Sequence, residues 1–427
     1  MFANVMPLAP MVVALRKSGF VISTVFALLH STGQIAYCFV TPNDQDAKFM
    51  RFYTSSILEN PYPSYKHWRA EHPIWQDEDT GDWIISRHDD VRSILKDSTQ
   101  YSSKAMGGDS VALPLLADDP PRHTQLRGIV NKAFTSRMLR SIENNVVQIA
   151  DSLVEGLAVG SEVDMVTGLT TPLPVAVISQ MMAIPDERAA DFKRWSDALT
   201  GTLAGASVAD RQLEIAEMAG YFNGLIPVRR ARPGSDLISS IVNAKFSGEG
   251  LADSEIVGFC MLLLIAGNET TTNLLGNFLN IMVDRPDLQQ RLLEEPGLIE
   301  AAIEETLRYD GPVQYLRRKL LKPATFYGQE VQEGEVAHVI MGSANRDESC
   351  YPDADQFVLD RAKNHHHTFG FGIHFCIGAP LARLEAKIAL KALFQRFKTF
   401  ERGQSENERV ASHLLRGFHH LHLVLAE

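Results

Sequence analysis

A single cysteine stands between glycines and phenylalanines in residues 369–378, which read Phe369-Gly370-Phe371-Gly372-Ile373-His374-Phe375-Cys376-Ile377-Gly378. Because glycine has no Cβ, backbone N–H groups on both sides of Cys376 can turn toward its sulfur. These donors favour a thiolate, and so does the N-terminus of the apolar helix that Pro380 opens. A buried thiolate is costly unless a metal ion binds it, and haem iron is such an ion. The alternative is an ordinary buried cysteine in a loop-to-helix turn.

The spacing Phe-x-x-Gly-x-x-x-Cys-x-Gly, formed by Phe369, Gly372, Cys376 and Gly378, resembles the haem-ligand loop of the cytochrome P-450 superfamily, the haem-thiolate monooxygenases. The resemblance covers residues 58–427 and implies the soluble bacterial type of this family. It implies a mainly α fold with a small β-sheet region, in which haem lies between the long central helix and the cysteine-loop helix. The implied cofactor is haem b (iron protoporphyrin IX), with Cys376 as the ligand to its metal.

The pattern of apolar residues predicts one mostly helical domain, residues 58–427, with a small sheet at one edge. Helical periodicity dominates from residue 122 to 294 and returns at 380–397. Short strands separated by turns are expected at residues 74–75, 83–85, 324–327 and 336–340. Residues 1–57 are expected to form an N-terminal extension, to which the sequence assigns no role.

Composition excludes several classes of protein. The 427 residues carry a formal net charge of −11, which argues against nucleic acid as the main partner because phosphate binding needs a basic surface. The four cysteines form no Cys-x-x-Cys pair, which fits a reducing, cytoplasmic setting and indicates neither a zinc module nor an iron–sulfur domain. No Gly-x-Gly-x-x-Gly opens a βα unit, so no attached flavin or nicotinamide domain is expected. Electrons must then come from another protein, and the resemblance implies a ferredoxin or flavodoxin with its reductase.

Residues 18–43 contain no Asp, Glu, Lys or Arg, and Arg16 and Lys17 precede them. This pattern resembles a signal or anchor segment. The polar residues 30–34 interrupt it, however, and leave pieces too short to span a bilayer. A cytoplasmic location without a membrane partner is therefore expected, and membrane association or export through this segment is the alternative.

The apolar run that ends at Ile265 leads into Ala266-Gly267-Asn268-Glu269-Thr270-Thr271-Thr272. Threonine hydroxyls compete for backbone carbonyls and glycine weakens a helix, so a distortion that opens a groove for a small ligand is expected. Ala266 and Gly267 are small enough for a flat macrocycle to lie against the backbone. Glu269 and Thr270 supply a carboxylate and a hydroxyl suited to delivering protons. The segment resembles the family's oxygen-activating segment, with Glu269 where many members have Asp; the alternative is a cap or kink without chemical meaning.

Glu305 and Arg308 stand at i and i+3, on one face of a predicted helix. Most such pairs are solvated surface bridges. This pair lies between residues 266–272 (the threonine segment) and residues 369–378 (the cysteine loop). Its position resembles that of the family's buried pair, which anchors the chain before that loop. Gln356 occupies the place where the family often has a third, arginine partner, and Arg361 or His366 is the expected replacement.

Four cationic side chains are candidates to bind the two haem propionates. His123 and Arg127 stand at i and i+4 on one predicted helix face, and Arg318 and His374 follow in the order that the family shows. The resemblance implies that these four bind the propionates, whereas each alone fits a surface role. Residues 365–367 are three histidines that cannot all face one ion from a strand or a helix, so they are expected to be loop residues.

The resemblance implies an oxidoreductase that acts on paired donors and incorporates molecular oxygen. The expected reaction inserts one oxygen atom into a lipophilic substrate, by hydroxylation or epoxidation, with Thr270 and Glu269 as catalytic residues. Two alternatives stay open: a peroxide-driven or non-oxygenase haem-thiolate enzyme, and a haem-binding sensor or carrier. Residues 101–116 and 200–225 are expected to cover the substrate pocket, and their apolar side chains indicate a lipophilic guest.

Overall fold

The computed structural model describes residues 25–29, 35–39, 49–107, 113–203, 211–246 and 249–427. The chain divides into two compact units, Met1–Phe52 and Tyr53–Glu427. In the smaller unit, strand β1 (Val25–Leu29) pairs antiparallel with strand β2 (Ile35–Phe39). Within the described residues, no helix is long and apolar enough to cross a membrane.

The larger unit begins before its first helix, α2 (Ser55–Glu59). The boundary predicted between residues 57 and 58 therefore falls inside α2. The side chain of Thr54 caps this helix by accepting a hydrogen bond from the N–H of Ile57. The independence of residues 1–57 as an extension stays a prediction.

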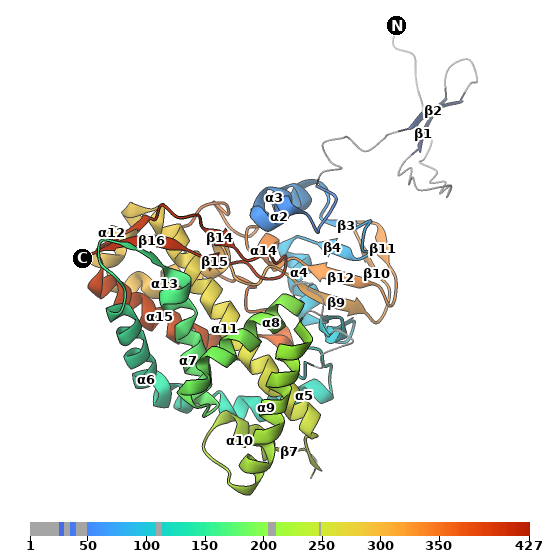
Figure 1. Cartoon of the computed structure of the whole chain (residues 1–427). Coiled ribbons are helices and arrows are strands. Elements are labelled where there is room, and N and C mark those ends of the chain that lie inside the picture. The colour runs from blue at the N-terminus through green and yellow to red at the C-terminus, as the bar shows by residue number, and fades with distance from the viewer. Residues whose placement is uncertain (1–24, 30–34, 40–48, 108–112, 204–210, 247–248) are drawn as a thin grey trace. The chain divides into compact units, whose positions relative to one another are not determined.

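Helices make up most of the larger unit, as the sequence predicted (Figure 1). The further helices are α3 (Tyr62–Glu71), α4 (His88–Lys96), α5 (Arg122–Ala133), α6 (Ser136–Glu155), α7 (Pro172–Met181), α8 (Ala189–Leu203), α9 (Gln212–Ala231), α10 (Leu237–Val242), α11 (Asp253–Val283), α12 (Pro286–Glu294), α13 (Ile299–Tyr309), α14 (Met341–Ala344) and α15 (Ala379–Arg396). The strands are β3 (Ile74–Gln76), β4 (Trp83–Ile85), β5 (Tyr101–Ser102), β6 (Glu162–Asp164), β7 (Lys245–Phe246), β8 (Glu249–Gly250), β9 (Leu316–Leu320), β10 (Ala324–Phe326), β11 (Gln329–Val331), β12 (Val336–Val339), β13 (Thr399–Arg402), β14 (Glu408–Arg409), β15 (Phe418–His420) and β16 (His422–Ala426). The predicted mainly α fold with small sheets is confirmed.

Helix α11 passes through the middle of the larger unit, with α6, α7 and α15 on one side and the strands β3, β4, β9 and β12 on the other (Figure 1). Asp253 and Glu255 stand in its first turn, where acidic side chains favour the helix dipole. Most of its 31 residues are buried, which is why the helix is apolar on nearly all faces. The N-terminal half packs in one hydrophobic cluster with α8, α9 and α10, and the C-terminal half in another with α6, α13 and α15. The residues between the two halves are those of the threonine segment.

The largest sheet has the strand order β3-β4-β12-β9-β5. Strands β3 and β4, both predicted from the sequence, pair antiparallel, and β12 joins β4 in parallel. The sequence does not predict β9, whose Leu-Arg-Arg-Lys-Leu is too basic to look like a strand. Strand β9 pairs antiparallel with β12 and buries Arg318 opposite Ala337. The sheet thus fixes the position of one predicted cofactor contact.

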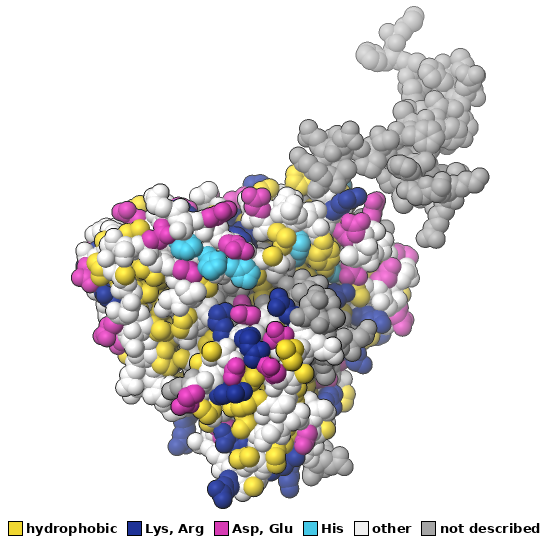
Figure 2. Space-filling view, in the orientation of Figure 1, with side chains coloured by type: hydrophobic (Ala, Val, Ile, Leu, Met, Phe, Trp, Pro, Cys, Tyr) yellow, Lys and Arg dark blue, Asp and Glu magenta, His cyan; other side chains and the backbone are white. Residues whose placement is uncertain are grey.

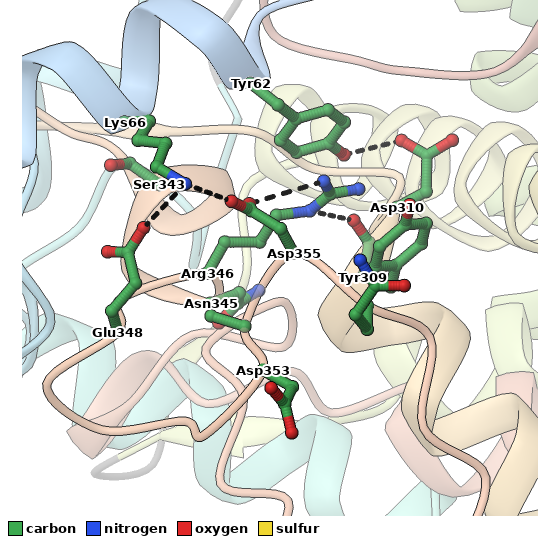
Figure 3. A network of polar contacts seen from close by, with 12 residues as sticks. Tyr62, Lys66, Tyr309, Asp310, Ser343, Asn345, Arg346, Glu348, Asp353 and Asp355 are labelled. Carbon is green, nitrogen blue, oxygen red and sulfur yellow. Dashed lines mark hydrogen bonds and ion pairs between the residues drawn. The ribbon is translucent and has the colours of Figure 1, made fainter.

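A polar network joins α3 to the end of α13 and to the chain before the cysteine loop (Figure 3). The guanidinium of Arg346 lies between the rings of Tyr62 and Tyr309, 3.4 and 3.7 Å from their centroids. Asp310 accepts a hydrogen bond from the hydroxyl of Tyr62 at 2.5 Å and from Nε of Arg416 at 2.6 Å. A crevice of about 760 Å³ opens beside this network, and none of the described residues that line it belongs to the cysteine loop. This crevice is therefore separate from the predicted site.

Candidate active site

The cysteine loop contains a 3₁₀ turn, Gly372–His374, and leads into α15. Gly372 has a φ of +73°, and a Cβ there would lie 2.7 Å from the carbonyl oxygen of Leu95, near the end of α4. A side chain is disfavoured on both grounds. The N–H of Cys376 donates to the carbonyl oxygen of Phe369 at 2.8 Å and closes the loop. Gly372 thus allows the loop to pack closely on α4, a role that the sequence does not indicate.

The sulfur of Cys376 accepts hydrogen bonds from the N–H groups of Gly378 and Ala379, in the arrangement expected from the glycine and the helix N-terminus. Cys376 is exposed to solvent, yet enough protein lies around its sulfur to affect its ionisation. Burial raises the pKa of the Cys376 thiol, and the N–H of Gly378 and the charge of Arg127 offset this only in part. The polypeptide alone favours the neutral thiol. A coordinating metal ion would deprotonate it, so this sulfur suits iron.

Phe369 lies beside the sulfur-bearing turn. Its ring contacts the ring of Phe375, with centroids 6.3 Å apart at an angle of 60°. The guanidinium of Arg383, on α15, lies 4.5 Å from the centroid of the Phe369 ring. The ring is thus fixed between the loop and the helix, and its contact with a cofactor stays a prediction.

The structure brings the four cationic candidates together. His123 and Arg127 lie on α5, Arg318 on β9 and His374 in the 3₁₀ turn, and the rings of the two histidines have centroids 4.1 Å apart. Burial and the positive charges of the other three lower the pKa of His374 to about 3, and burial lowers the pKa of Arg318 to about 10. In the described part of the chain, no carboxylate lies within ion-pair distance of any of the four, although the charge of Asp119 acts on Arg318 and His123. Such a cluster favours an anionic ligand.

His123 provides the test of whether the residues present fit haem. Both of its ring nitrogens are buried without a hydrogen-bond partner. An unsatisfied buried group of this kind costs about 1–3 kcal/mol. Carboxylates from a bound molecule would satisfy His123 and the charges of Arg127 and Arg318 together. The two propionates of haem are such carboxylates, so the site fits the cofactor.

The distortion predicted in α11 is not a break, because the α-helix is continuous from Asp253 to Val283. The hydroxyl of Thr270 donates to the carbonyl oxygen of Ala266 at 2.8 Å, so the helix accommodates this polar group. Ala266 is exposed although the five residues before it are buried or partly buried. Gly267 faces α7 instead, where a Cβ would lie 3.5 Å from Ile178. Ala266 and Thr270 therefore mark the open side of α11, and a cofactor contact by Gly267 stays a prediction.

Glu269 contacts α8. Burial and the charge of Asp197, with which its carboxyl shares a hydrogen bond, raise the pKa of Glu269 to about 7. Lys193 donates to both carboxylate oxygens of Asp197 at 2.9 Å. Asp197 is half exposed, so this carboxyl pair leads from the surface to the residue before Thr270. The sequence gives no signal for Asp197 or Lys193, because only the packing of α8 on α11 brings them to Glu269.

The predicted ion pair on α13 is buried, with 1% of each residue exposed. Arg308 donates from Nη2 and Nε to the two carboxylate oxygens of Glu305, at 2.7 and 2.9 Å. Its Nη1 donates to the carbonyl oxygens of Asn345 and Ala354 at 3.0 and 2.8 Å. The pair therefore holds the segment that leads to the cysteine loop.

The third partner of this pair is Arg361, one of the two expected candidates. Its Nε lies 3.1 Å from both carboxylate oxygens of Glu305. His366, the other candidate, contacts Glu304 at 3.3 Å. Gln356 contributes only its carbonyl oxygen, which accepts from the arginine of the pair at 2.7 Å. Arg361 lies further along the chain than the family pattern places its arginine, which is why spacing alone leaves it undecided.

Replacing Glu305 by Ala is expected to give little haem-loaded protein. The change leaves two buried guanidinium groups, of Arg308 and Arg361, without their carboxylate, at a cost of about 3–5 kcal/mol. The haem content of purified protein and the midpoint of denaturant unfolding measure the effect. Glu300→Ala is the matched control, because Glu300 is on the same helix and its side chain is 64% exposed. Equal haem content and midpoints in the two variants would contradict the expectation.

The segments predicted to cover a substrate pocket are described in part. Residues 108–112 of the first segment and 204–210 of the second lie outside the described residues. The described part of the first includes β5 and a 3₁₀ turn at Ser103–Met106, from which Ser103 Oγ contacts Nε2 of His374 at 2.9 Å. Ser103 is a contact of the cationic cluster that the sequence does not reveal.

A sulfur that accepts two N–H hydrogen bonds thus lies near a group of basic side chains, an arrangement that fits a haem-thiolate protein. The family description "Cytochrome P450" matches residues 227–416. Cytochrome P450 109 of Bacillus spizizenii is 36% identical over 356 residues, 82% of this chain and 87% of that protein. The polyketide biosynthesis cytochrome P450 PksS of Bacillus subtilis is 35% identical over 363 residues, 80% of this chain and 89% of that protein. The crystal structure of CYP109E1 from Bacillus megaterium with testosterone has a TM-score of 0.77 at 37% identity, covering 86% of this chain and 99% of that one.

The chain belongs to the cytochrome P450 family. The predicted family and fold are thereby confirmed. Membership assigns the chain a haem cofactor and monooxygenase activity, which makes it an oxidoreductase.

Proposed function

We propose that the chain inserts one oxygen atom from dioxygen into a lipophilic small molecule, by hydroxylation or epoxidation. Its electrons come from a separate ferredoxin or flavodoxin with its reductase, its cofactor is haem b, and it works in the cytoplasm. The observation that carries the proposal is the Cys376 sulfur, with its two N–H donors, near the buried His123, whose ring nitrogens have no hydrogen-bond partner among the described residues. The four cysteines and the charge of −11 agree with a cytoplasmic enzyme that does not bind nucleic acid.

The residues of the site divide into ligand, anchors and contacts. Cys376 is the proposed thiolate ligand of the iron, and haem, when bound, supplies the activation of dioxygen. The cationic cluster anchors the propionates through charge-assisted hydrogen bonds. Its members are His123, Arg127, Arg318 and His374. The remaining proposed contacts of the cofactor are Ala266, Gly267, Phe369, Gly372 and Gly378.

Thr270 and Glu269 are the proposed catalytic residues because they can deliver protons. The Thr270 hydroxyl lies on the open side of α11 and keeps oxygen lone pairs free while it donates to Ala266. Glu269 has a pKa near neutrality, the range in which a carboxyl group both gives and takes a proton. A relay of this kind favours an oxygenase over an isomerase or dehydratase, which has less need of one.

Two measurements test the proposal. The reduced carbon monoxide complex of the haem-loaded chain should show the red-shifted absorption band that a thiolate ligand produces. Product should then form with dioxygen and a ferredoxin–reductase pair. Turnover with peroxide alone and none with dioxygen would favour the peroxide-driven alternative instead.

The substrate class is proposed from the relatives and from the apolar pocket segments. CYP109E1 has been crystallised with testosterone, and PksS is named for polyketide biosynthesis. Testosterone and polyketides are lipophilic, and the sequence predicts a lipophilic substrate for this chain as well. A screen for spectral shifts with one fatty acid, one terpenoid, one steroid and one polyketide would identify the class.

The coupling of electron use to product formation is expected to fall as pH rises through about 7. Below that pH the Glu269 carboxyl is protonated and can donate, and above it the group is a carboxylate, because burial and Asp197 raise its pKa to about 7. Product formed per electron pair consumed, measured from pH 6 to 8.5, follows this titration. A Glu269→Gln variant should be poorly coupled at every pH, since an amide does not titrate.

The Asp197→Asn variant tests whether Glu269 is the group whose ionisation changes the coupling. Removing the negative charge of Asp197, which raises the pKa of Glu269, should move the coupling midpoint to lower pH. Lys193 then lacks its carboxylate partner, and its positive charge acts in the same direction. A midpoint that stays near 7 in this variant would show that another group titrates.

A further inference from the structure

Two histidines and an aspartate lie where three strands meet: Asp164 ends β6, His420 ends β15 and His422 begins β16. His420 and His422 flank the fully buried Leu421, and their two rings lie on the same side, because they stack on each other. Asp164 lies directly across from His422 in the register of β6 and β16, and such cross-strand partners project to the same side. Figure 2 shows histidine side chains gathered where Figure 1 places β14, β15 and β16, with acidic side chains beside them.

The three side chains are close enough to share one ion. Oδ2 of Asp164 lies 2.9 Å from Nδ1 of His420. One ligand atom from each of the three residues lies within 4.8 Å of the other two. Zinc bonds of about 2.0–2.2 Å place neighbouring ligand atoms about 3 Å apart, so small rotations of the side chains complete the geometry. The rings of His420 and His422 are already stacked, with centroids 5.8 Å apart at 20°.

The ligands are held by a second layer of hydrogen bonds, which is typical of metal sites. Oδ1 of Asp164 accepts from the N–H groups of Val166 and Leu421, both at 3.0 Å. Nδ1 of His422 lies 3.1 Å from the carbonyl oxygen of Glu406, a contact that orients its ring. Burial raises the pKa of Asp164, but the hydrogen bonds from His420 and the backbone outweigh it, so the group is a carboxylate at neutral pH.

We propose that Asp164, His420 and His422 bind one divalent transition-metal ion of the Zn²⁺ class. Imidazole nitrogens suit Zn²⁺, Ni²⁺ and Cu²⁺, whereas Mg²⁺ and Ca²⁺ require oxygen ligands. The ion takes the position between Nδ1 of His420 and Oδ2 of Asp164, and the neutral imidazole of His420 then carries its hydrogen on Nε2. Because β6 and β16 are far apart in the sequence, the ion ties the two strands together in the folded chain. None of these residues belongs to the cysteine loop or to α11.

The test uses the haem-loaded full chain without a histidine tag. Zinc chloride is titrated in competition with a chromophoric chelator, and the unfolding midpoint is recorded at each zinc concentration. One equivalent of zinc should bind and raise the midpoint, because the ion binds the folded state. His420→Ala and His422→Ala should each weaken binding by at least about tenfold, the loss seen when even a second-layer partner is removed. Magnesium chloride should leave the midpoint unchanged.

His419→Ala is the matched control, because His419 is the exposed neighbour of His420 on β15 and belongs to no ligand group. It should bind zinc as the unmodified chain does. Wild-type affinity in the double variant His420→Ala/His422→Ala would overturn the proposal, as would an equal loss in His419→Ala. Loss of binding in Cys350→Ser would place the zinc at the other ligand group of the described chain, His88, Asp89 and Cys350, and would also overturn it.

Discussion

A Cys376→Ser variant is expected to show no red-shifted absorption band in its reduced carbon monoxide complex and no product above background. The hydroxyl of serine is far less acidic than a thiol, so it supplies neither the anionic nor the polarizable ligand that favours O–O cleavage. The N–H groups of Gly378 and Ala379 cannot compensate, because even with the sulfur present they do not overcome the effect of burial. Absorption of the reduced carbon monoxide complex and product formation are the two measurements.

Cys350→Ser is the control for this experiment, because Cys350 is an exposed free cysteine outside the cysteine loop. It should keep the band and the activity. A Cys376→Ser protein that keeps the band would refute the ligand assignment and leave one of the other three cysteines as the thiolate source. Loss of haem together with the band agrees with the assignment, since the ligand bond is then missing.

The features that the sequence predicts well are those fixed by neighbouring residues. Cys376, Gly378 and the start of α15 form a local arrangement, because the N–H groups that face the sulfur belong to the next turn of the chain. The helical period predicts α11 for the same reason, since its buried faces repeat within one element. The buried state of Glu305 and Arg308 is not fixed locally; the resemblance to the family implied it, whereas their spacing alone fits a surface pair.

The features that the sequence does not predict depend on packing between distant segments. Asp197 meets Glu269 only because α8 lies on α11. Strand β9 is stabilised by its neighbours β5 and β12 rather than by its own basic residues, so no local pattern indicates it. Gly372 is required by the carbonyl oxygen of Leu95, a contact that spacing within the loop cannot reveal.

A Thr270→Ala variant is expected to lose coupling while it keeps its fold. Thr270 donates only to the carbonyl oxygen of Ala266 in its own helix, and alanine is the better helix former, so haem and substrate should still bind. The variant should continue to consume the reduced electron donor and dioxygen, because electron delivery does not need this hydroxyl. The step that requires a positioned proton should slow by about 10²–10⁴-fold, so that oxygen leaves as hydrogen peroxide instead of entering product.

Two ratios test this expectation: product formed per reduced electron donor consumed, and hydrogen peroxide formed per reduced electron donor consumed. Thr270→Ser is the matched variant, because it keeps a hydroxyl at the same position and loses only a methyl group. It should retain most of the coupling, whereas Thr270→Ala should shift the balance to peroxide. A purely structural role for Thr270 would leave both ratios unchanged in both variants, because the hydrogen bond to Ala266 affects only the helix. Such a result would remove Thr270 from the relay and leave Glu269, with its partner Asp197, as the proton source to test.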